Sequence, residues 1–306
     1  MRLAYGLLAL LALAYLYLAA RPGGRAPVWL YARGLDLLPL LGLAVLALGL
    51  WTSSRRRPVL QRGRGAAFAC LAVVVGSASV RLHFPYPSSR ERRPSAVRFR
   101  LPVEGAWQVL WGGERAEHNR LATLSPDRRF ALVLVKPEDQ EARSEDARDH
   151  AAWGEVVVAP AAGRVVVVRD GVPDETGAPG GPGVPGGGLA YSGNYVVLRV
   201  AEGEYLFLTH LLSGSIEVRE GRSVEAGDWI ARAGQSGFDP VAPLPHVALH
   251  LQTTPDERWG EGVPFFVFDY QADGSGVSRG VPRGGLGPGG RWSGQNVRQV
   301  EASGSD

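Results

Sequence analysis

The side chains best suited to chemistry in this chain are its six histidines, of which His210, His246 and His250 lie in segments with a strand-like pattern. Imidazole binds metals and exchanges protons near neutral pH. On a strand, residues two apart lie on one face roughly 6.5 Å from each other, whereas residues four apart are separated by roughly 13 Å. His246 and His250 therefore cannot grip one ion unless His246 lies in a turn that folds back. Spacing alone leaves a hydrogen-bonded strand histidine as an equally good interpretation of His250.

Composition and context exclude several other kinds of site. The single cysteine, Cys70, excludes an internal disulfide and a multi-thiolate metal site. The glycine-rich segment 177–188 lacks the Lys-Ser/Thr that completes a phosphate-binding loop. Ser213 and Ser215 lack the flanking residues of a nucleophile elbow. The histidines therefore remain the chemical centre of the sequence.

The charge of the chain is divided unevenly along its length. The first 100 residues hold 15 arginines and two acidic residues, a net charge of +13, whereas the remainder holds 18 basic and 28 acidic residues, a net charge of −10. A domain that binds duplex DNA or RNA needs a basic face to neutralise phosphates. The acidic second part therefore argues against a nucleic-acid partner.

Three apolar segments precede the histidines, at 3–19, 35–51 and 66–80. Because an α-helix rises about 1.5 Å per residue, about 20 residues cross the hydrocarbon layer of a membrane. We therefore predict that residues 1–83 form a membrane anchor with about three transmembrane helices, although the first segment also has the pattern of a signal peptide. Arginines flank the segments on both sides, so charge alone leaves the orientation open.

From residue 97 the pattern changes to short runs rich in Val and aromatic residues, separated by Gly, Pro and Asp, which predicts an all-β barrel or sandwich. We expect a linker at 84–96, the β domain at 97–285, a flexible surface loop at 171–188 and a flexible tail at 286–306. The predicted strands are 97–99, 107–111, 130–136, 155–159, 163–169, 194–200, 205–210, 215–218, 229–233 and 247–252.

Four segments of the β domain occur in an order that resembles the lysostaphin-type, LytM-like zinc metallopeptidases. APAAGRV (159–165) is similar to the Ala-Pro-x-x-Gly-x-Val hairpin of that family, and THLLSGSIEVREGRSVEAGD (209–228) is similar to its His-Leu…Val-x-x-Gly-x-x-Val-x-x-Gly-Asp segment. GQSG (234–237) matches its Gly-x-Ser-Gly turn, and PHVALHLQ (245–252) resembles its Pro-His-Leu-His segment. The resemblance implies a barrel or sandwich of the duplicated hybrid motif type, spanning 97 to about 285.

The resemblance also implies roles for the histidines. The family holds zinc with a His, an Asp and the second His of Pro-His-Leu-His, and a water completes the open site that hydrolysis needs. The second His of that motif maps onto His250, and the His that assists at the activated water maps onto His210. The first His of the motif maps onto Ala248, unless a two-residue insertion leaves His246 in that role.

Two of the family's metal ligands have no counterpart in this chain. The Asp of a Tyr-Ala-x-Asp pattern falls on Val133, and the first His, two residues after an Asn, falls on Leu121. His118 could substitute if its loop shifts. Zinc held by one or two histidines lacks a carboxylate to offset its charge, so its binding is expected to be weak. The candidate metal ligands are therefore His250 and His118, and the candidate catalytic residues are His210 and His246.

We therefore expect a membrane-anchored, catalytically degenerate binding or regulatory module with its C-terminal domain outside the cytoplasm. The resemblance implies peptidoglycan or a cell-wall hydrolase as its partner, since degenerate members of the family activate cell-wall amidases. No cofactor is needed for that role.

Two alternatives remain open. The first is an active zinc metalloendopeptidase that cleaves peptidoglycan crosslinks, with Asp127 or Asp139 completing the ligand set. The second is a carrier of the biotinyl or lipoyl type, which requires an exposed attachment lysine, and the only lysine is Lys136.

Overall fold

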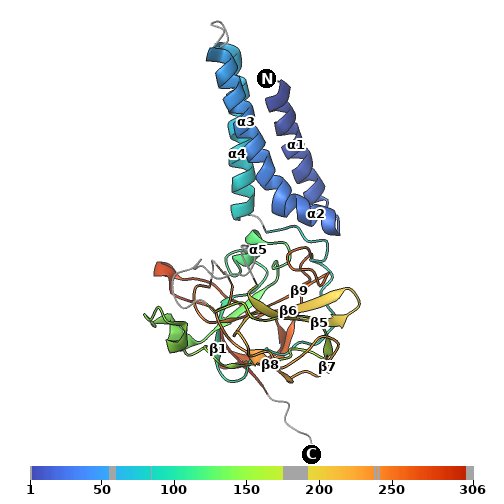
Figure 1. The fold of residues 1–306 in the computed structure, drawn as a ribbon, viewed down its shortest axis with the longest axis vertical. Coiled ribbons are helices and arrows are strands. Elements are labelled where there is room, and N and C mark those ends of the chain that lie inside the picture. The colour runs from blue at the N-terminus through green and yellow to red at the C-terminus, as the bar shows by residue number, and fades with distance from the viewer. Residues whose placement is uncertain are drawn as a thin grey trace, which may run out of the picture.

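The computed structural model describes residues 2–54, 60–83, 85–174, 192–237, 239 and 242–300, and it has two parts. A bundle of helices at the N-terminus packs against one side of a rounded β domain (Figure 1). The predicted flexible loop at 171–188 lies mostly outside the described residues.

The bundle consists of three long helices side by side, joined at one end by a short helical corner (Figure 1). Two stretches are long and apolar enough to cross a membrane, Arg2–Ala19 and Arg25–Leu48, and about a fifth of each is buried. The third helix carries a shorter apolar stretch, Gly65–Gly76. Leu13 and Leu40 are more than half exposed. The bundle therefore presents an apolar outer surface, as a membrane-spanning bundle does. The helices are α1 (Arg2–Ala19), α2 (Arg25–Trp29), the π-helix η1 (Leu30–Gly34), α3 (Leu35–Ser54) and α4 (Leu60–His83).

The β domain is built on a ten-stranded antiparallel sheet in the order β11-β10-β12-β1-β2-β9-β6-β5-β4-β7, with a separate pair β3-β8. The prediction of a mostly β domain preceded by apolar helices is confirmed. The strands are β1 (Trp107–Trp111), β2 (Leu132–Val135), β3 (Val156–Val158), β4 (Gly163–Arg169), β5 (Asn194–Ala201), β6 (Glu204–Leu211), β7 (Ser223–Val224), β8 (Trp229–Arg232), β9 (Val247–Gln252), β10 (Val267–Ala272), β11 (Ser275–Gly280) and β12 (Asn296–Gln299); the short helices are α5 (Leu121–Leu124), η2 (Pro137–Gln140), η3 (Ala147–Asp149) and η4 (Pro288–Gly290).

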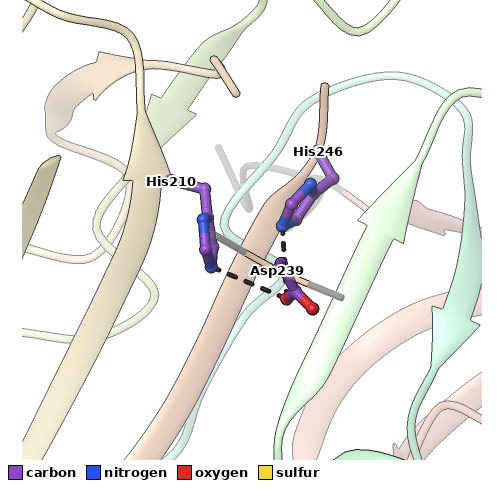
Figure 2. Close-up of side chains that lie close together, drawn as sticks. All are labelled: His210, Asp239 and His246. Atoms are coloured by element: carbon purple, nitrogen blue, oxygen red, sulfur yellow. Dashed lines mark ion pairs between the residues drawn. The ribbon is translucent and has the colours of Figure 1, made fainter. Parts of the chain in front are cut away.

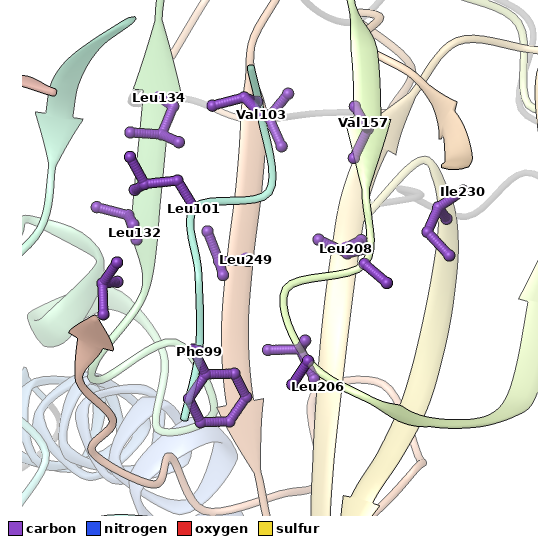
Figure 3. Packing of buried hydrophobic residues seen from close by; sticks show 14 of the residues in the cluster. Phe99, Leu101, Val103, Leu132, Leu134, Val157, Leu206, Leu208, Ile230 and Leu249 are labelled. Atoms are coloured by element: carbon purple, nitrogen blue, oxygen red, sulfur yellow. The ribbon is translucent and has the colours of Figure 1, made fainter. Parts of the chain in front are cut away.

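Alternation along the central strands divides their side chains between two faces. Leu132, Leu206 and Leu249, from β2, β6 and β9, point into the main hydrophobic core together with residues of the β3–β8 pair (Figure 3). Because successive residues of a strand face opposite ways, the intervening residues, such as Val133 and Ala248, lie on the second face.

The expectation of a flexible tail at 286–306 is wrong for its middle part. β12 pairs with both β1 and β10, and Val297 is buried in the main core. The segment 215–218 is not a strand, and 97–99 contributes only an isolated bridge at Phe99. β11 holds two glycines and one valine, and β12 holds a single valine among polar residues, so neither strand shows the apolar alternation that would have predicted it.

The predicted linker packs against the β domain. The hydroxyl of Ser95 donates a hydrogen bond to the carboxylate of Glu204 at 2.5 Å, and Tyr86 is fully buried. The ring of Tyr31, from the helical corner, meets that of Tyr86 edge to face at 5.2 Å, and its hydroxyl donates to the carbonyl of Thr123 in the β domain. The bundle therefore joins the β domain through specific buried contacts.

Candidate functional site

The second face of the sheet carries the positions at which the resemblance expects metal ligands. In the register of the central strands, Val133 of β2 lies opposite Ala248 of β9, and Ala248 lies opposite Thr209 of β6. Leu121, at the start of α5, packs onto the same face and belongs to the same hydrophobic cluster as Val133 and Ala248.

We call this group the aliphatic cluster. Leu121, Val133 and Ala248 are each at most 5% exposed. Hydrocarbon side chains offer no lone pair to a metal ion, so zinc does not fit where these three residues meet. Ala248 belongs to this cluster, and His250 lies two residues further along β9 on the same face, opposite Phe207 of β6. The remaining buried members of the cluster are Leu110, Trp111, Ala131, Val135 and Ala242.

A second, polar group lies beside the sheet at the end of β6 and the start of β9. The rings of His210 and His246 lie 4.5 Å apart at 42°, and both side chains are about 1% exposed. Their Nε2 atoms lie 3.6 Å and 3.8 Å from Oδ2 of Asp239 (Figure 2). We call these three residues the histidine cluster. The structure thus brings together both predicted catalytic residues.

The backbone around His210 is held in an unusual conformation. His210 has a φ of 63°, in the left-handed region that few residues other than glycine adopt. Its N–H donates to the carbonyl of Ser192, and its own carbonyl accepts from the N–H of Gly234. These bonds from two sides fix a conformation that would otherwise cost about 1–3 kcal/mol.

The start of β5 and the Gly-x-Ser-Gly segment 234–237 meet next to His210. The hydroxyl of Ser236 donates to the carbonyl of Leu211 at 2.6 Å and accepts the N–H of Asn194 at 2.9 Å. The amide of Asn194 donates to the same carbonyl at 3.0 Å. Gly193 has a φ of 58° and lies so close to Ser236 that a Cβ would collide with its backbone. These motif residues therefore position the histidine.

The protonation of the two histidines follows from their surroundings. Burial is the main cause that lowers the pKa of both rings, and the Asp239 carboxylate opposes it only in part. Nδ1 of His210 lies 2.9 Å from the carbonyl of Ser236, and Nδ1 of His246 lies 2.7 Å from that of Leu244. Because a carbonyl only accepts, each neutral ring carries its proton on Nδ1, and each Nε2 presents a lone pair toward Asp239.

His250 occupies a different place on β9. Its ring stacks on Phe207 at 4.8 Å and 17°, and its Nε2 lies 3.9 Å from Oδ2 of Asp127. Burial lowers the pKa of His250 to about 4, against the opposing effect of Asp127. Nη1 of Arg128 lies 3.9 Å from Oδ2 of Asp239. The positive charge of Arg128 helps to lower the pKa of His210, His246 and His250.

The structure does not bring His118 and His250 together as predicted metal ligands. His118 lies in a turn before α5, where its Nδ1 faces the carbonyl of Gly284 at 2.9 Å and its side chain is 34% exposed. Asp139 accepts the backbone N–H groups of residues 151 and 152, which is a structural role. Among the described residues, the group with three ligand atoms close enough to share one ion is the histidine cluster, whose ligand atoms lie within 4.8 Å of one another.

Sequence reasoning missed Asp239. It follows the Gly-x-Ser-Gly turn by two residues and precedes the Pro-His pair, and no recognised pattern includes it. The signal that could have found it is its place between that turn and the Pro-His pair, since its carboxylate lies within 4 Å of both rings.

Comparison with known proteins assigns a family to part of the chain. Residues 146–258 match Peptidase family M23, so this part of the chain is a domain of that family. No curated protein matches the chain. The matched range includes the histidine cluster and leaves Leu121 and Val133 outside.

Several solved structures are similar to the β domain. They include a zinc-containing peptidase from Vibrio cholerae (21% identity, 52% of this chain and 37% of that chain, TM-score 0.32). They also include the catalytic domain of the antimicrobial peptidase lysostaphin from Staphylococcus simulans (16%, 43% and 73%, TM-score 0.27). A third is pseudoalterin, an M23 metalloprotease from the deep sea (14%, 66% and 96%, TM-score 0.35). The chain spans only 37% of the Vibrio cholerae peptidase.

Proposed function

We propose that this chain, whose residues 146–258 are a Peptidase family M23 domain, is a membrane-anchored and catalytically degenerate member of that family. It acts as a binding or regulatory module at the cell envelope, and its partner is peptidoglycan or a cell-wall hydrolase. The observation that carries the proposal is the aliphatic cluster, in which Leu121 and Val133, at two positions expected to hold zinc, pack together with Ala248.

Neither the aliphatic cluster nor the histidine cluster forms an open metal site. Hydrolysis by zinc needs a cation with an accessible position, where a bound water is activated or a carbonyl is polarised. At the aliphatic cluster no side chain binds the cation. At the histidine cluster the side chains of His210, His246 and Asp239 are each about 1% exposed, so a peptide substrate has no route to their ligand atoms. Neither group combines donor atoms with access.

The helical bundle supports the proposed location. The chain runs along α1 toward the β domain, returns along α3 and runs toward the β domain again along α4 (Figure 1). If all three cross a membrane, the N-terminus and the β domain lie on opposite sides. An N-terminus in the cytoplasm then places the M23 domain outside, where peptidoglycan lies.

The test uses the full chain purified in detergent and incubated with isolated peptidoglycan. Cosedimentation with peptidoglycan, or a faster rate of an added cell-wall amidase, supports the proposal when the chain alone, without the amidase, releases no new free amino groups. If the chain alone releases free amino groups, as a known endopeptidase does, it cleaves crosslinks. That result supports the alternative, an active zinc peptidase. Absence of binding, of stimulation and of cleavage contradicts both.

A further inference from the structure

We propose that His210, Asp239 and His246 bind one divalent transition-metal ion, of which zinc is the representative, in a closed structural site. This site is displaced from the aliphatic cluster, where the resemblance expects the metal. The proposal does not depend on the proposed function, since a structural ion here is compatible with a binding module or with an enzyme.

The first argument is the donor set. Two imidazoles and one carboxylate are the ligands that zinc and its neighbours in the first transition row accept. The ligand atoms lie within 4.8 Å of one another, and all three side chains converge on one point (Figure 2). His210 lies at the end of β6, Asp239 lies in the connection between β8 and β9, and His246 lies just before β9, so an ion would connect three segments.

The second argument is an electrostatic conflict inside the cluster. Nε2 of His210 and Nε2 of His246 are completely buried and make no hydrogen bond, and each faces Oδ2 of Asp239 at under 4 Å. With both ring protons on Nδ1, two lone pairs point at a carboxylate, and this arrangement is repulsive unless a cation lies between them. Buried polar groups without partners are costly, so their convergence indicates a ligand.

The third argument is the set of groups that orients the rings. A histidine that binds a metal usually donates its other N–H to a carbonyl or carboxylate, which fixes the tautomer. The carbonyls of Ser236 and Leu244 receive both Nδ1–H groups here. The rings are thus held with Nε2 free to coordinate before any ion arrives.

Two observations define the kind of site. The side chains are about 1% exposed, so the ion would serve the fold and not a substrate. Arg128, whose Nη1 lies 3.9 Å from Asp239, already places a positive charge nearby. It repels a cation and therefore lowers the affinity of the site. Removal of the Arg128 charge should strengthen metal binding. A cluster that binds no metal and is held by hydrogen bonds alone would show no such change.

The experiment measures metal content in the full chain purified in detergent. The protein is stripped with a chelator, equilibrated with zinc chloride and separated from free ion. We expect about one zinc per chain, and cobalt in its place should give the visible absorption of a coordinated ion. The conservative variant Asp239→Asn should weaken zinc binding by at least about tenfold. Arg128→Gln should strengthen it.

The matched control is His250→Gln, which alters another buried histidine of the same face outside the cluster. It should leave zinc binding unchanged. A wild-type chain that takes up no zinc or cobalt overturns the proposal, whether or not any variant folds. Zinc binding that survives Asp239→Asn and disappears in His250→Gln overturns it as well. Neither readout depends on peptidoglycan, so this proposal and the proposed function fail separately.

Discussion

The aliphatic cluster and the histidine cluster occupy neighbouring parts of one fold but have opposite chemistry. The first joins Leu121, Val133 and Ala248 in a dry contact without donor atoms. The second buries two imidazoles and a carboxylate almost as deeply. The difference shows that similar burial accompanies opposite chemistry within one domain, with hydrocarbon packing in one cluster and converging donor atoms in the other. Four substitutions test that contrast.

The largest effect is expected from Val133→Asp, which returns a carboxylate to the aliphatic cluster without its partners. An unpaired buried charge should lower the free energy of unfolding by about 4 kcal/mol or more. Denaturant unfolding of the full chain measures it, with Val133→Ala as the control for lost volume. If the two variants are equally stable, the aliphatic cluster admits water or rearranges around the new carboxylate, and it is not a dry contact.

Leu121→Ala should cost about 3 kcal/mol, because it leaves a cavity among packed neighbours. Leu124 lies in the same short helix and is 46% exposed, so Leu124→Ala provides the matched control and should change stability by about 0.5 kcal/mol or less. A small effect of Leu121→Ala would mean that α5 is not held by this cluster.

A smaller effect is expected in the pH dependence of stability. Burial lowers the pKa of His250 from 6.5 to about 4 in the folded chain, so the unfolded chain binds the extra proton between these values. Stability is therefore retained above pH 6.5 and falls as the pH decreases toward 4, by about 1.4 kcal/mol per unit for one such group. Asp127 favours protonation of His250, and Arg128 opposes it.

The variant His250→Gln should remove that contribution and reduce the slope of unfolding free energy against pH between 6.5 and 4, while the buried rings of His210 and His246 keep theirs. His118→Gln, at a partly exposed ring, serves as the control and should leave the slope unchanged. An unaltered slope in His250→Gln would contradict the burial of this ring.

The smallest expected effect is that of Ser236→Ala, which removes a hydroxyl bonded to Leu211 and Asn194 behind His210. The loss of stability should be about 1–2 kcal/mol, since two buried backbone groups lose a partner. Ser213 is exposed, and its hydrogen bond to Asp174 is donated by the backbone N–H. Ser213→Ala should therefore leave the free energy of unfolding unchanged. A neutral Ser236→Ala would show that Asn194 alone holds the turn.

Much of the fold was predictable from local sequence. β1, β4 and β9 begin and end at the predicted residues because their apolar runs are bounded by glycine, proline or charged residues. β11 and β12 were missed, because an edge or peripheral strand with glycine and arginine carries little periodic signal. Their pairing partners are distant in the chain, and register with β10 and β1 decides their conformation.

The candidate site was predictable only in part. The sequence identified His210 and His246, and it placed Leu121 and Val133 where ligands were expected. It could not show that Ala248 joins them, because that follows from strand register. It also could not find Asp239, whose carboxylate is brought to both rings by tertiary folding and not by a local pattern. The pairing of His118 with His250 as metal ligands stays a prediction without a contact to support it, since one lies before α5 and the other in the middle of β9.

The dry packing of Leu121, Val133 and Ala248 has a consequence for engineering. Each single substitution toward a metal site would insert one donor atom among hydrocarbon side chains that offer it no partner. Since whole domains are stable by only about 5–15 kcal/mol, such single variants would lie close to unfolding. A metal site at this position would therefore have to be introduced with all of its ligands at once.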